Sequence, residues 1–183
     1  MKKILGLVLS LTAISAVCAG VLAYIDGMTR APIAATKEKN TLKAAADVMP
    51  SGVEKVEAVA WADAAKKTPT VFVGRDASGA VAGYAVSGSD PDGYGGTIEL
   101  MVGFEADRRT VVCYKKLAAA ETPGLGMKLT TPEFSGQFSG KDGSSLSVRK
   151  DGGEIEAITA ATITSRAVCR AIGDAQKKAA AVK

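Results

Sequence analysis

The longest apolar segment of the chain lies at its N-terminus. Lys2 and Lys3 precede an uncharged run from Ile4 to Ile25. About 20 apolar residues span the hydrocarbon core of a bilayer, whereas the apolar core of a signal peptide is usually about 7–15 residues long. Because lysines favour the cytoplasmic side, we expect a cytoplasmic N-terminus at residues 1–3, a transmembrane anchor at residues 4–25 and an extracytoplasmic remainder.

Two other interpretations of this segment stay open. The small residues Ser15, Ala16 and Ala19 could direct cleavage of a signal peptide. Cys18 could carry a lipid, although Val17 before it is larger than such sites usually allow. The length of the uncharged run favours the uncleaved anchor.

The rest of the chain contains short stretches in which apolar and polar residues alternate, as is typical of β-strands. A run of good helix formers predicts a helix over 34–48, within a connecting segment at residues 26–50. Strands with helices at both ends predict an α+β fold, with one domain of antiparallel strands and flanking helices at residues 51–183. The expected elements of this domain are a hairpin around Asp76–Gly79, strands at Ile98–Phe104 and Thr110–Leu117 around a turn at Ala106–Arg109, a short strand in Leu146–Lys150, and a final helix starting near Ser165.

The composition removes several classes of chemistry. The chain has no histidine, which excludes Ser-His-Asp and Cys-His catalysis, His-ligated zinc and axial His ligation of haem. A net charge of +4 without a dense basic run argues against a nucleic-acid partner. Because Cys18, Cys113 and Cys169 have no CxxC spacing, we expect no metal or iron–sulfur site. Whether Cys113 pairs with Cys169 stays open.

Two glycine-containing segments suggest contact with a ligand. In DPDGYGGTIEL, the glycines after Tyr94 would let the backbone approach a ligand, and the Tyr94 ring could stack on a flat group. A plain glycine turn before a strand is the alternative. In ETPGLGMK, Pro123 fixes one φ, while Gly124 and Gly126 are free to take positive φ. No Ser or Thr follows the lysine, so the segment is not a P-loop, but it could present backbone N–H groups to a ligand.

The segment ITAATITSRAV contains four hydroxyls, on Thr159, Thr162, Thr164 and Ser165, at the expected start of the last helix. A single hydroxyl, on Thr164 or Ser165, would cap that helix, which is worth about 1 kcal/mol. The unpaired N–H groups and the positive dipole end of a helix also suit a phosphate. Capping alone does not account for four hydroxyls.

Together the three segments resemble a known family. ITAATITSRAV resembles the flavinylation motif of FMN-binding domains, roughly [Ser/Asp/Thr]-Gly-Ala-Thr-x-[Ser/Thr]-Ser. DGYGGTIELMVGF and ETPGLGMK resemble the other two signature segments, in the same order and at similar spacing. Such domains occur in the G subunit of the Rnf ion-translocating electron-transport complex and in the C subunit of the sodium-pumping NADH:quinone reductase. The segments ETPGLG and TITSRAV are more similar to the Rnf protein.

The resemblance implies that Thr162 carries FMN through a phosphoester bond, which a separate flavin transferase makes from FAD. It implies that Thr164, Ser165 and the helix N-terminus hold the phosphate, and that the two glycine-containing segments line the isoalloxazine and ribityl region. The cofactor-binding residues expected in this way are Thr162, Thr164, Ser165, Ala161, Ile163, Tyr94, Gly95, Gly96, Glu121, Thr122, Pro123, Gly124, Leu125 and Gly126.

The sequence departs from the family at two positions. The motif usually has glycine where this chain has Ala160, and an alanine there would impede modification if the site needs positive φ. The family also tends to carry a histidine at the position of Ala119, so any proton transfer by that histidine is absent. An electron relay is therefore favoured over a centre that converts a substrate.

The function implied is that of an electron-relay subunit of an Rnf-like complex in the plasma membrane, rather than a self-sufficient enzyme. Its partners would be the other membrane and redox subunits, fed by reduced ferredoxin or NADH, with Na⁺ or H⁺ transport in the polytopic subunits. Two alternatives stay open. The chain could be a stand-alone extracytoplasmic flavin reductase acting on a small molecule or quinone, or a non-redox binding protein whose motif is vestigial.

Overall fold

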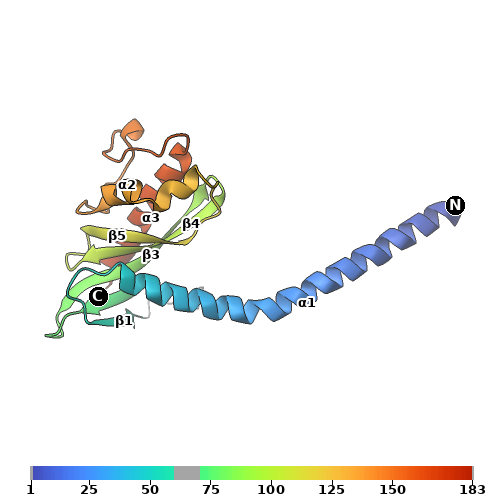
Figure 1. Ribbon diagram of the computed structural model, residues 1–183, viewed down its shortest axis with the longest axis horizontal. Helices are drawn as coiled ribbons and strands as arrows, with labels where there is room; N and C mark the ends of the chain where they lie inside the picture. Colours follow the sequence, from blue (N-terminus) through green and yellow to red (C-terminus); the bar gives the residue numbers. More distant parts are fainter. Residues whose placement is uncertain (1, 60–70, 183) are drawn as a thin grey trace. The chain divides into compact units, whose positions relative to one another are not determined.

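The computed structural model describes residues 2–59 and 71–182. The chain forms two compact units, Met1–Lys39 and Asn40–Lys183. The first unit consists of the greater part of helix α1 (Lys2–Asp47), which starts at the N-terminus in Figure 1. The second unit contains the remaining elements and the end of α1.

Helix α1 has the length and composition of a helix that can cross a membrane. Its apolar part has a mean hydropathy of 2.3, and its large side chains are exposed, including Leu7 at 70% and Leu11 at 67%. A signal sequence would share these properties. Residues 34–48, expected as a connecting helix, continue α1 as far as Asp47.

The second unit is built on a five-stranded antiparallel sheet in the order β1-β2-β3-β4-β5, so each strand pairs with the next one along the chain. The hairpins expected around Asp76–Gly79 and Ala106–Arg109 are confirmed, because these turns join β2 to β3 and β4 to β5. The strands are β1 (Lys55–Val59), β2 (Val71–Arg75), β3 (Val81–Gly93), β4 (Gly96–Glu105) and β5 (Val111–Ala118).

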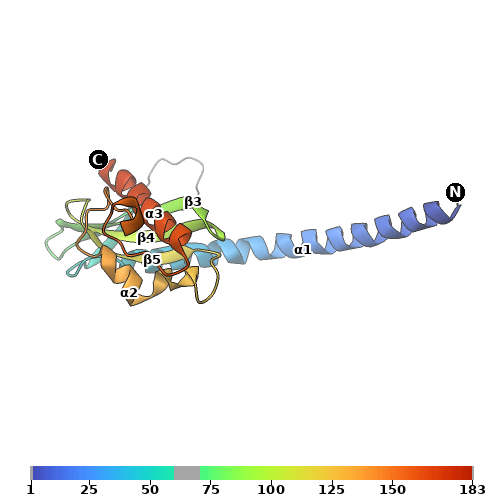
Figure 2. The same cartoon turned by 90° about the horizontal axis from the view of Figure 1, so that it is seen from above.

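Side chains alternate between the two faces of this sheet. Phe72 and Met101 face a small core that also contains Ala45, near the end of α1, and Val48, just after it. The other face packs against helix α3 (Thr162–Ala180), which lies across the sheet in Figure 2. The larger core on that face includes Val71, Tyr84, Val86, Leu100, Val102, Phe104, Ala167, Val168, Ala171 and Ile172. The expected α+β fold is confirmed.

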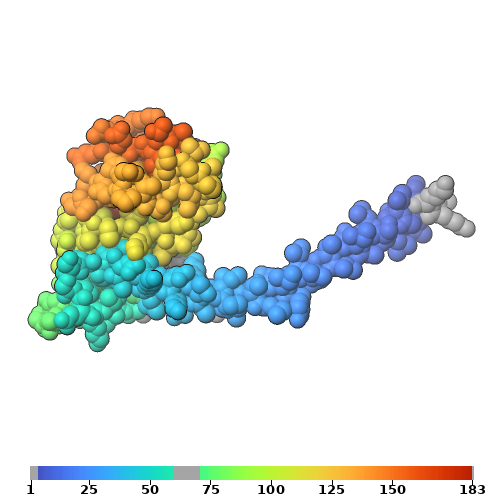
Figure 3. All heavy atoms as spheres, in the orientation of Figure 1, coloured from blue at the N-terminus to red at the C-terminus, as the bar shows by residue number. Residues whose placement is uncertain are grey.

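Short helical turns connect β5 to α3. They are η1 (Gly126–Thr130), α2 (Pro132–Ser135), η2 (Gly136–Phe138) and η3 (Arg149–Asp151). In Figure 3 the yellow-orange and orange atoms of this connection form a continuous layer on one side of the domain.

Two expectations for this connection and for α3 are wrong. Leu146–Lys150 is not a strand, because Val148 forms only an isolated bridge with Ile155 and the chain then turns into η3. Its few apolar residues pack into the core without an adjacent strand to pair with. Helix α3 begins at Thr162 rather than near Ser165.

The thiols of Cys113 and Cys169 are free. Cys169 is a residue of α3 and faces the core between this helix and the sheet, whereas Cys113 packs against the core on the opposite face of the sheet. Burial raises the pKa of both thiols, that of Cys169 to about 12. The pairing that the sequence left open is therefore absent, because the sheet separates the two side chains.

Candidate functional site

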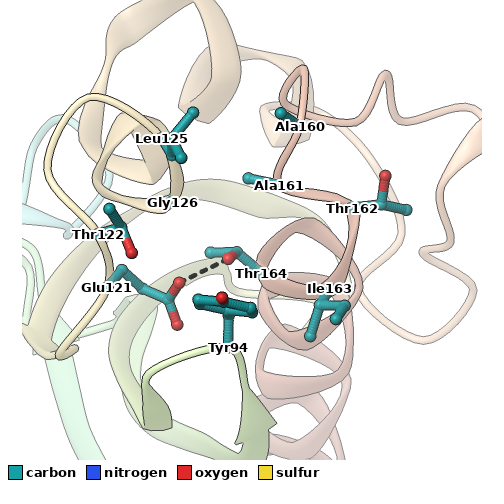
Figure 4. A pocket seen from close by; sticks show the side chains of 10 residues that line it. All are labelled: Tyr94, Glu121, Thr122, Leu125, Gly126, Ala160, Ala161, Thr162, Ile163 and Thr164. Carbon is teal, nitrogen blue, oxygen red and sulfur yellow. Dashed lines mark hydrogen bonds between the residues drawn. The ribbon is translucent and has the colours of Figure 1, made fainter.

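Three segments that are far apart in the sequence meet at one pocket of about 470 Å³. They are the turn between β3 and β4, the loop after β5 and the start of α3, and Figure 4 shows their side chains around the pocket. The volume falls in the range of small-molecule sites, about 300–1,000 Å³. The pocket is lined by Tyr94, Glu121, Thr122, Leu125, Gly126, Ala160, Ala161, Thr162, Ile163 and Thr164.

Tyr94 reaches the pocket from a tight hairpin. Gly93 pairs with Gly96 across the turn, so only Tyr94 and Gly95 connect the two strands. Gly96 has a φ of 111°, a conformation that favours glycine. The Tyr94 side chain is 71% exposed. The hairpin therefore presents an aromatic ring that a flat ligand can stack on.

An ion pair holds β3 to α3 next to this hairpin. The Arg170 guanidinium donates two hydrogen bonds, of 2.7 and 2.8 Å, to the two carboxylate oxygens of Asp90. The Asp92 backbone N–H donates a third, at 3.0 Å. Asp90 is only 6% exposed, and the hydrogen bonds from Arg170 hold the pKa of this carboxyl below its usual range. The pair fixes the turn that carries Tyr94 relative to α3.

Glu121 connects all three segments of the pocket. The Thr164 hydroxyl donates a hydrogen bond of 2.6 Å to Glu121 Oε2, drawn as the dashed line in Figure 4. The Gly95 backbone N–H donates one of 3.1 Å to Glu121 Oε1. Glu121 is 6% exposed and Thr164 is 1% exposed. One buried carboxylate thus joins the loop after β5 to the start of α3 and to the β3–β4 turn.

Two glycines of the pocket segments are explained by contacts within the protein. A Cβ on Gly126 would lie 2.3 Å from Glu121 Oε2 and 2.9 Å from Thr164 Oγ1. A Cβ on Gly95 would lie 1.9 Å from the carbonyl oxygen of Ala120. Room for a ligand, which the sequence suggested as the reason for Gly95, is therefore not what requires a glycine there.

Pro123 and Gly124 shape the loop after β5 without lining the pocket. The Leu125 N–H donates to the Thr122 carbonyl at 3.2 Å, and Gly124 has a φ of 76°. With proline at the second position, this is the pattern of a type II turn. The positive φ that the sequence allowed is found at Gly124 and not at Gly126.

The first turn of α3 has no side-chain cap. Its N-cap residue is Ala161, and no side chain makes a capping hydrogen bond there. The Ser165 hydroxyl, expected as a cap and phosphate ligand, accepts a 2.9 Å hydrogen bond from the Ile158 N–H and donates one of 3.0 Å to the Ala161 carbonyl. The first-turn N–H groups and the positive dipole end of α3 therefore suit an anionic group in the pocket.

The four hydroxyls near this turn have different surroundings. Thr164 and Ser165 are buried and form hydrogen bonds within the protein. Thr159 is exposed and lines another pocket, beside Lys128. Thr162 is half-buried and lines the pocket with Tyr94, and its hydroxyl has no hydrogen-bond partner within residues 2–59 and 71–182.

Ala160 adopts a left-handed backbone conformation, with a φ of 61°. This conformation costs a non-glycine residue roughly 1–2 kcal/mol. Ala160 also lines the pocket, two residues before Thr162. The position at which the flavinylation motif usually has glycine is thus one at which the structure requires positive φ.

Most of the residues expected to bind a cofactor do lie together. Those that line the pocket are Tyr94, Glu121, Thr122, Leu125, Gly126, Ala161, Thr162, Ile163 and Thr164. The others do not line it, and they are Gly95, Gly96, Pro123, Gly124 and Ser165. The sequence did not predict Ala160 as a lining residue, although its departure from the motif was a signal. It offered no signal that Asp90 pairs with Arg170.

Comparisons with known proteins identify the domain. A family model described as an FMN-binding domain matches residues 93–177. The G subunit of an ion-translocating oxidoreductase complex from Methanosarcina acetivorans is 34% identical over 176 residues, which cover 95% of this chain and 93% of that protein. The G subunit of the Na⁺-translocating ferredoxin:NAD⁺ oxidoreductase complex from Acetobacterium woodii is 30% identical over 183 residues, 91% and 87% of the two chains.

The fold is also found in a solved structure. The C subunit of the Na⁺-translocating NADH-quinone reductase from Parabacteroides distasonis has a TM-score of 0.50 at 21% identity, and the match covers 72% of this chain and 79% of that one. Residues 93–177 include every residue that lines the pocket. The chain therefore belongs to the family of G subunits of ion-translocating oxidoreductase complexes, and residues 93–177 form its FMN-binding domain.

Proposed function

We propose that this chain is an electron-relay subunit of a membrane ion-translocating oxidoreductase complex, and that it carries FMN on Thr162 through a phosphoester bond. One observation carries the proposal. Of the four hydroxyls around the start of α3, that of Thr162 alone both lines the pocket and is left out of the hydrogen bonds among the described residues. Its modification would break no hydrogen bond among the described residues, and the modified group would lie in the pocket.

The pocket suits the parts of FMN. The uncapped first turn of α3 offers N–H groups to a phosphate. Tyr94, Leu125 and Ile163 are exposed by 71%, 42% and 49% and give an apolar rim for a flat ring. Bound FMN accepts and gives one or two electrons, and the protein supplies position and electrostatics. These features support an electron carrier whose cofactor is reached from outside.

The bond to Thr162 needs a separate enzyme. A general base must lie within hydrogen-bond reach of the hydroxyl that it activates. Among the described residues that line the pocket, Glu121 is the one carboxylate, and its oxygens already accept hydrogen bonds from Thr164 and Gly95. We therefore assign the transfer of FMN from FAD to a flavin transferase that acts on this chain during maturation.

Helix α1 supports attachment to the membrane. We assign residues 4–25 to the transmembrane anchor and residues 1–3 to the cytoplasm, because two lysines precede the apolar run. Residues 51–183, with the FMN site, then lie outside the cytoplasm. A covalent bond prevents the loss of FMN there, where free FMN is scarce.

Electron flow and ion transport are divided between subunits in this proposal. Residues 4–25 contain no charged side chain, so this span cannot form an ion path of its own. We assign ion transport to polytopic partner subunits. This chain passes electrons between neighbouring redox subunits that are fed by ferredoxin or NADH.

Membranes that lack this subunit test the relay role. Adding back the wild-type gene with a flavin transferase should restore electron transfer from reduced ferredoxin to NAD⁺, and Thr162→Ser should restore it at least in part. Thr162→Ala should insert into the complex and restore nothing. Full activity with Thr162→Ala would contradict the proposal, and turnover of a diffusible acceptor by the isolated chain would favour a stand-alone reductase.

A further inference from the structure

The FMN pocket contains one formally charged side chain, that of Glu121, among the ten described residues that line it. Its carboxylate accepts hydrogen bonds from the Thr164 hydroxyl at Oε2 and from the Gly95 N–H at Oε1. Both partners are dipoles, and the ten residues include no lysine or arginine. The pocket lining thus carries a negative charge without a cation of its own.

Two other acidic residues, Asp90 and Asp151, differ from Glu121 because each is paired with an arginine. Asp90 receives two hydrogen bonds from Arg170, and Asp151 receives two from Arg166. Both arginines belong to the first half of α3 and are already engaged. Although α3 borders the pocket and carries two arginines, neither of them pairs with Glu121.

We infer that Glu121 lowers the reduction potential of the FMN and holds the pocket segments in place. The inference rests on the proposed function in one respect, that FMN occupies this pocket. Two-electron reduction adds two electrons from the redox partner, or from dithionite in a titration, and one or two protons from solvent. When FMN takes up fewer protons than electrons it gains negative charge, which a nearby buried carboxylate disfavours.

Glu121→Gln removes the negative charge of the side chain and keeps its size and shape. A glutamine oxygen can accept from the Gly95 N–H, and its amide can donate to the Thr164 hydroxyl, which can turn to accept. The variant should keep the fold and the bound FMN and lose only the charge. Thr164→Val is the opposite change, since it keeps the charge and removes one hydrogen bond to it. Glu133→Gln is a control at an exposed acid on α2, outside the pocket.

The test is a spectroelectrochemical titration of the FMN-loaded chain and these variants between pH 6 and 8. Glu121→Gln should increase the ratio of reduced to oxidised FMN at a given potential at least tenfold. For a two-electron couple this corresponds to a rise in the midpoint potential of about 30 mV. Thr164→Val should leave it unchanged or lower it, and Glu133→Gln should leave it unchanged. Equal shifts in the same direction for Glu121→Gln and Thr164→Val would overturn the inference, because loosening of the pocket would then explain both. An unchanged potential in Glu121→Gln would overturn it as well.

The outcome can be separated from the covalent bond. If the wild-type chain carries no FMN adduct, the proposed linkage fails. The effect of Glu121 on the potential can then be measured with added FMN, as the ratio of the dissociation constants of oxidised and reduced FMN. Glu121→Gln should tighten binding of reduced FMN relative to oxidised FMN at least tenfold. An equal ratio in both proteins would contradict the role of Glu121 whether or not Thr162 is modified.

Discussion

The Arg170 guanidinium donates two hydrogen bonds to the Asp90 carboxylate, and so joins α3 to the strand that leads to Tyr94. Asp90 is buried, while the side chain of Arg170 is 46% exposed. Arg170→Ala should therefore cost about 2 kcal/mol of stability, between the values for exposed and buried pairs. Chemical denaturation at pH 7 measures this loss. Arg166→Ala removes a similar but more exposed pair with Asp151 and should cost less.

The same ion pair predicts a pH dependence. Because the pKa of Asp90 is lowered in the folded protein, its contribution is present above the unfolded pKa of about 4 and is lost as the pH falls through the folded pKa. The difference in stability between wild type and Arg170→Ala should therefore be constant from pH 7 to 5 and shrink below about pH 4. A difference that grows on acidification would contradict this assignment.

Ala160→Gly should stabilise the protein. Glycine adopts the left-handed conformation of this position (φ 61°) without the strain that alanine has there. Glycine is also more flexible in the unfolded chain, which offsets part of this gain, so the free energy of unfolding should rise by up to about 1 kcal/mol. FMN should be incorporated at least as fast as in wild type. Ala181→Gly is the matched control, because Ala181 has a φ of −84° and its replacement should destabilise. Loss of stability in Ala160→Gly would show that the conformation is not strained.

Gly126→Ala should damage the pocket. The new methyl group would lie 2.3 Å from the Glu121 carboxylate, and displacing this buried contact should cost about 1–3 kcal/mol. FMN loading, measured by in-gel fluorescence, should fall. Gly136→Ala is the control, since Gly136 has helical backbone angles and no atom lies within 4 Å of the added methyl. Equal loading of the two variants would mean that the contact between Gly126 and Glu121 does not hold the pocket.

Cys113 and Cys169 should react slowly with thiol reagents. Only the thiolate reacts, and burial raises the pKa of both thiols, that of Cys169 to about 12. At pH 8, iodoacetamide should label both residues much more slowly in the folded protein than in urea, as measured by mass spectrometry. A disulfide between them under non-reducing conditions would contradict their positions on opposite faces of the sheet.

Much of this architecture could be predicted from local patterns. Alternating residues and turn signals placed the hairpins at Asp76–Gly79 and Ala106–Arg109 correctly, because a hairpin depends on residues that are close in sequence. The sequence did not indicate strand β1, and it wrongly indicated a strand at Leu146–Lys150. Both outcomes depend on whether an adjacent strand is present to form hydrogen bonds with the segment. Short apolar stretches do not contain that information.

The candidate site was predictable in outline. Three motifs identified the segments that form the pocket, since the residue types in each are restricted. The motifs did not show that Ser165 bonds to Ile158, that Thr164 bonds to Glu121, or that Asp90 pairs with Arg170. Each of these hydrogen bonds forms only because α3 packs in a particular position against the rest of the domain. The start of α3 was itself expected three residues too late.

The central claim is that Thr162 carries FMN, and intact-mass analysis of the chain co-expressed with a flavin transferase tests it most directly. Wild type should show one adduct of about 438 Da, FMN less one water, with in-gel flavin fluorescence. Thr159→Ala and Thr162→Ser should keep the adduct, and Thr162→Ala should lose both the mass and the fluorescence. An adduct that remains on Thr162→Ala, or maps to Thr159 or Thr164, would contradict the account.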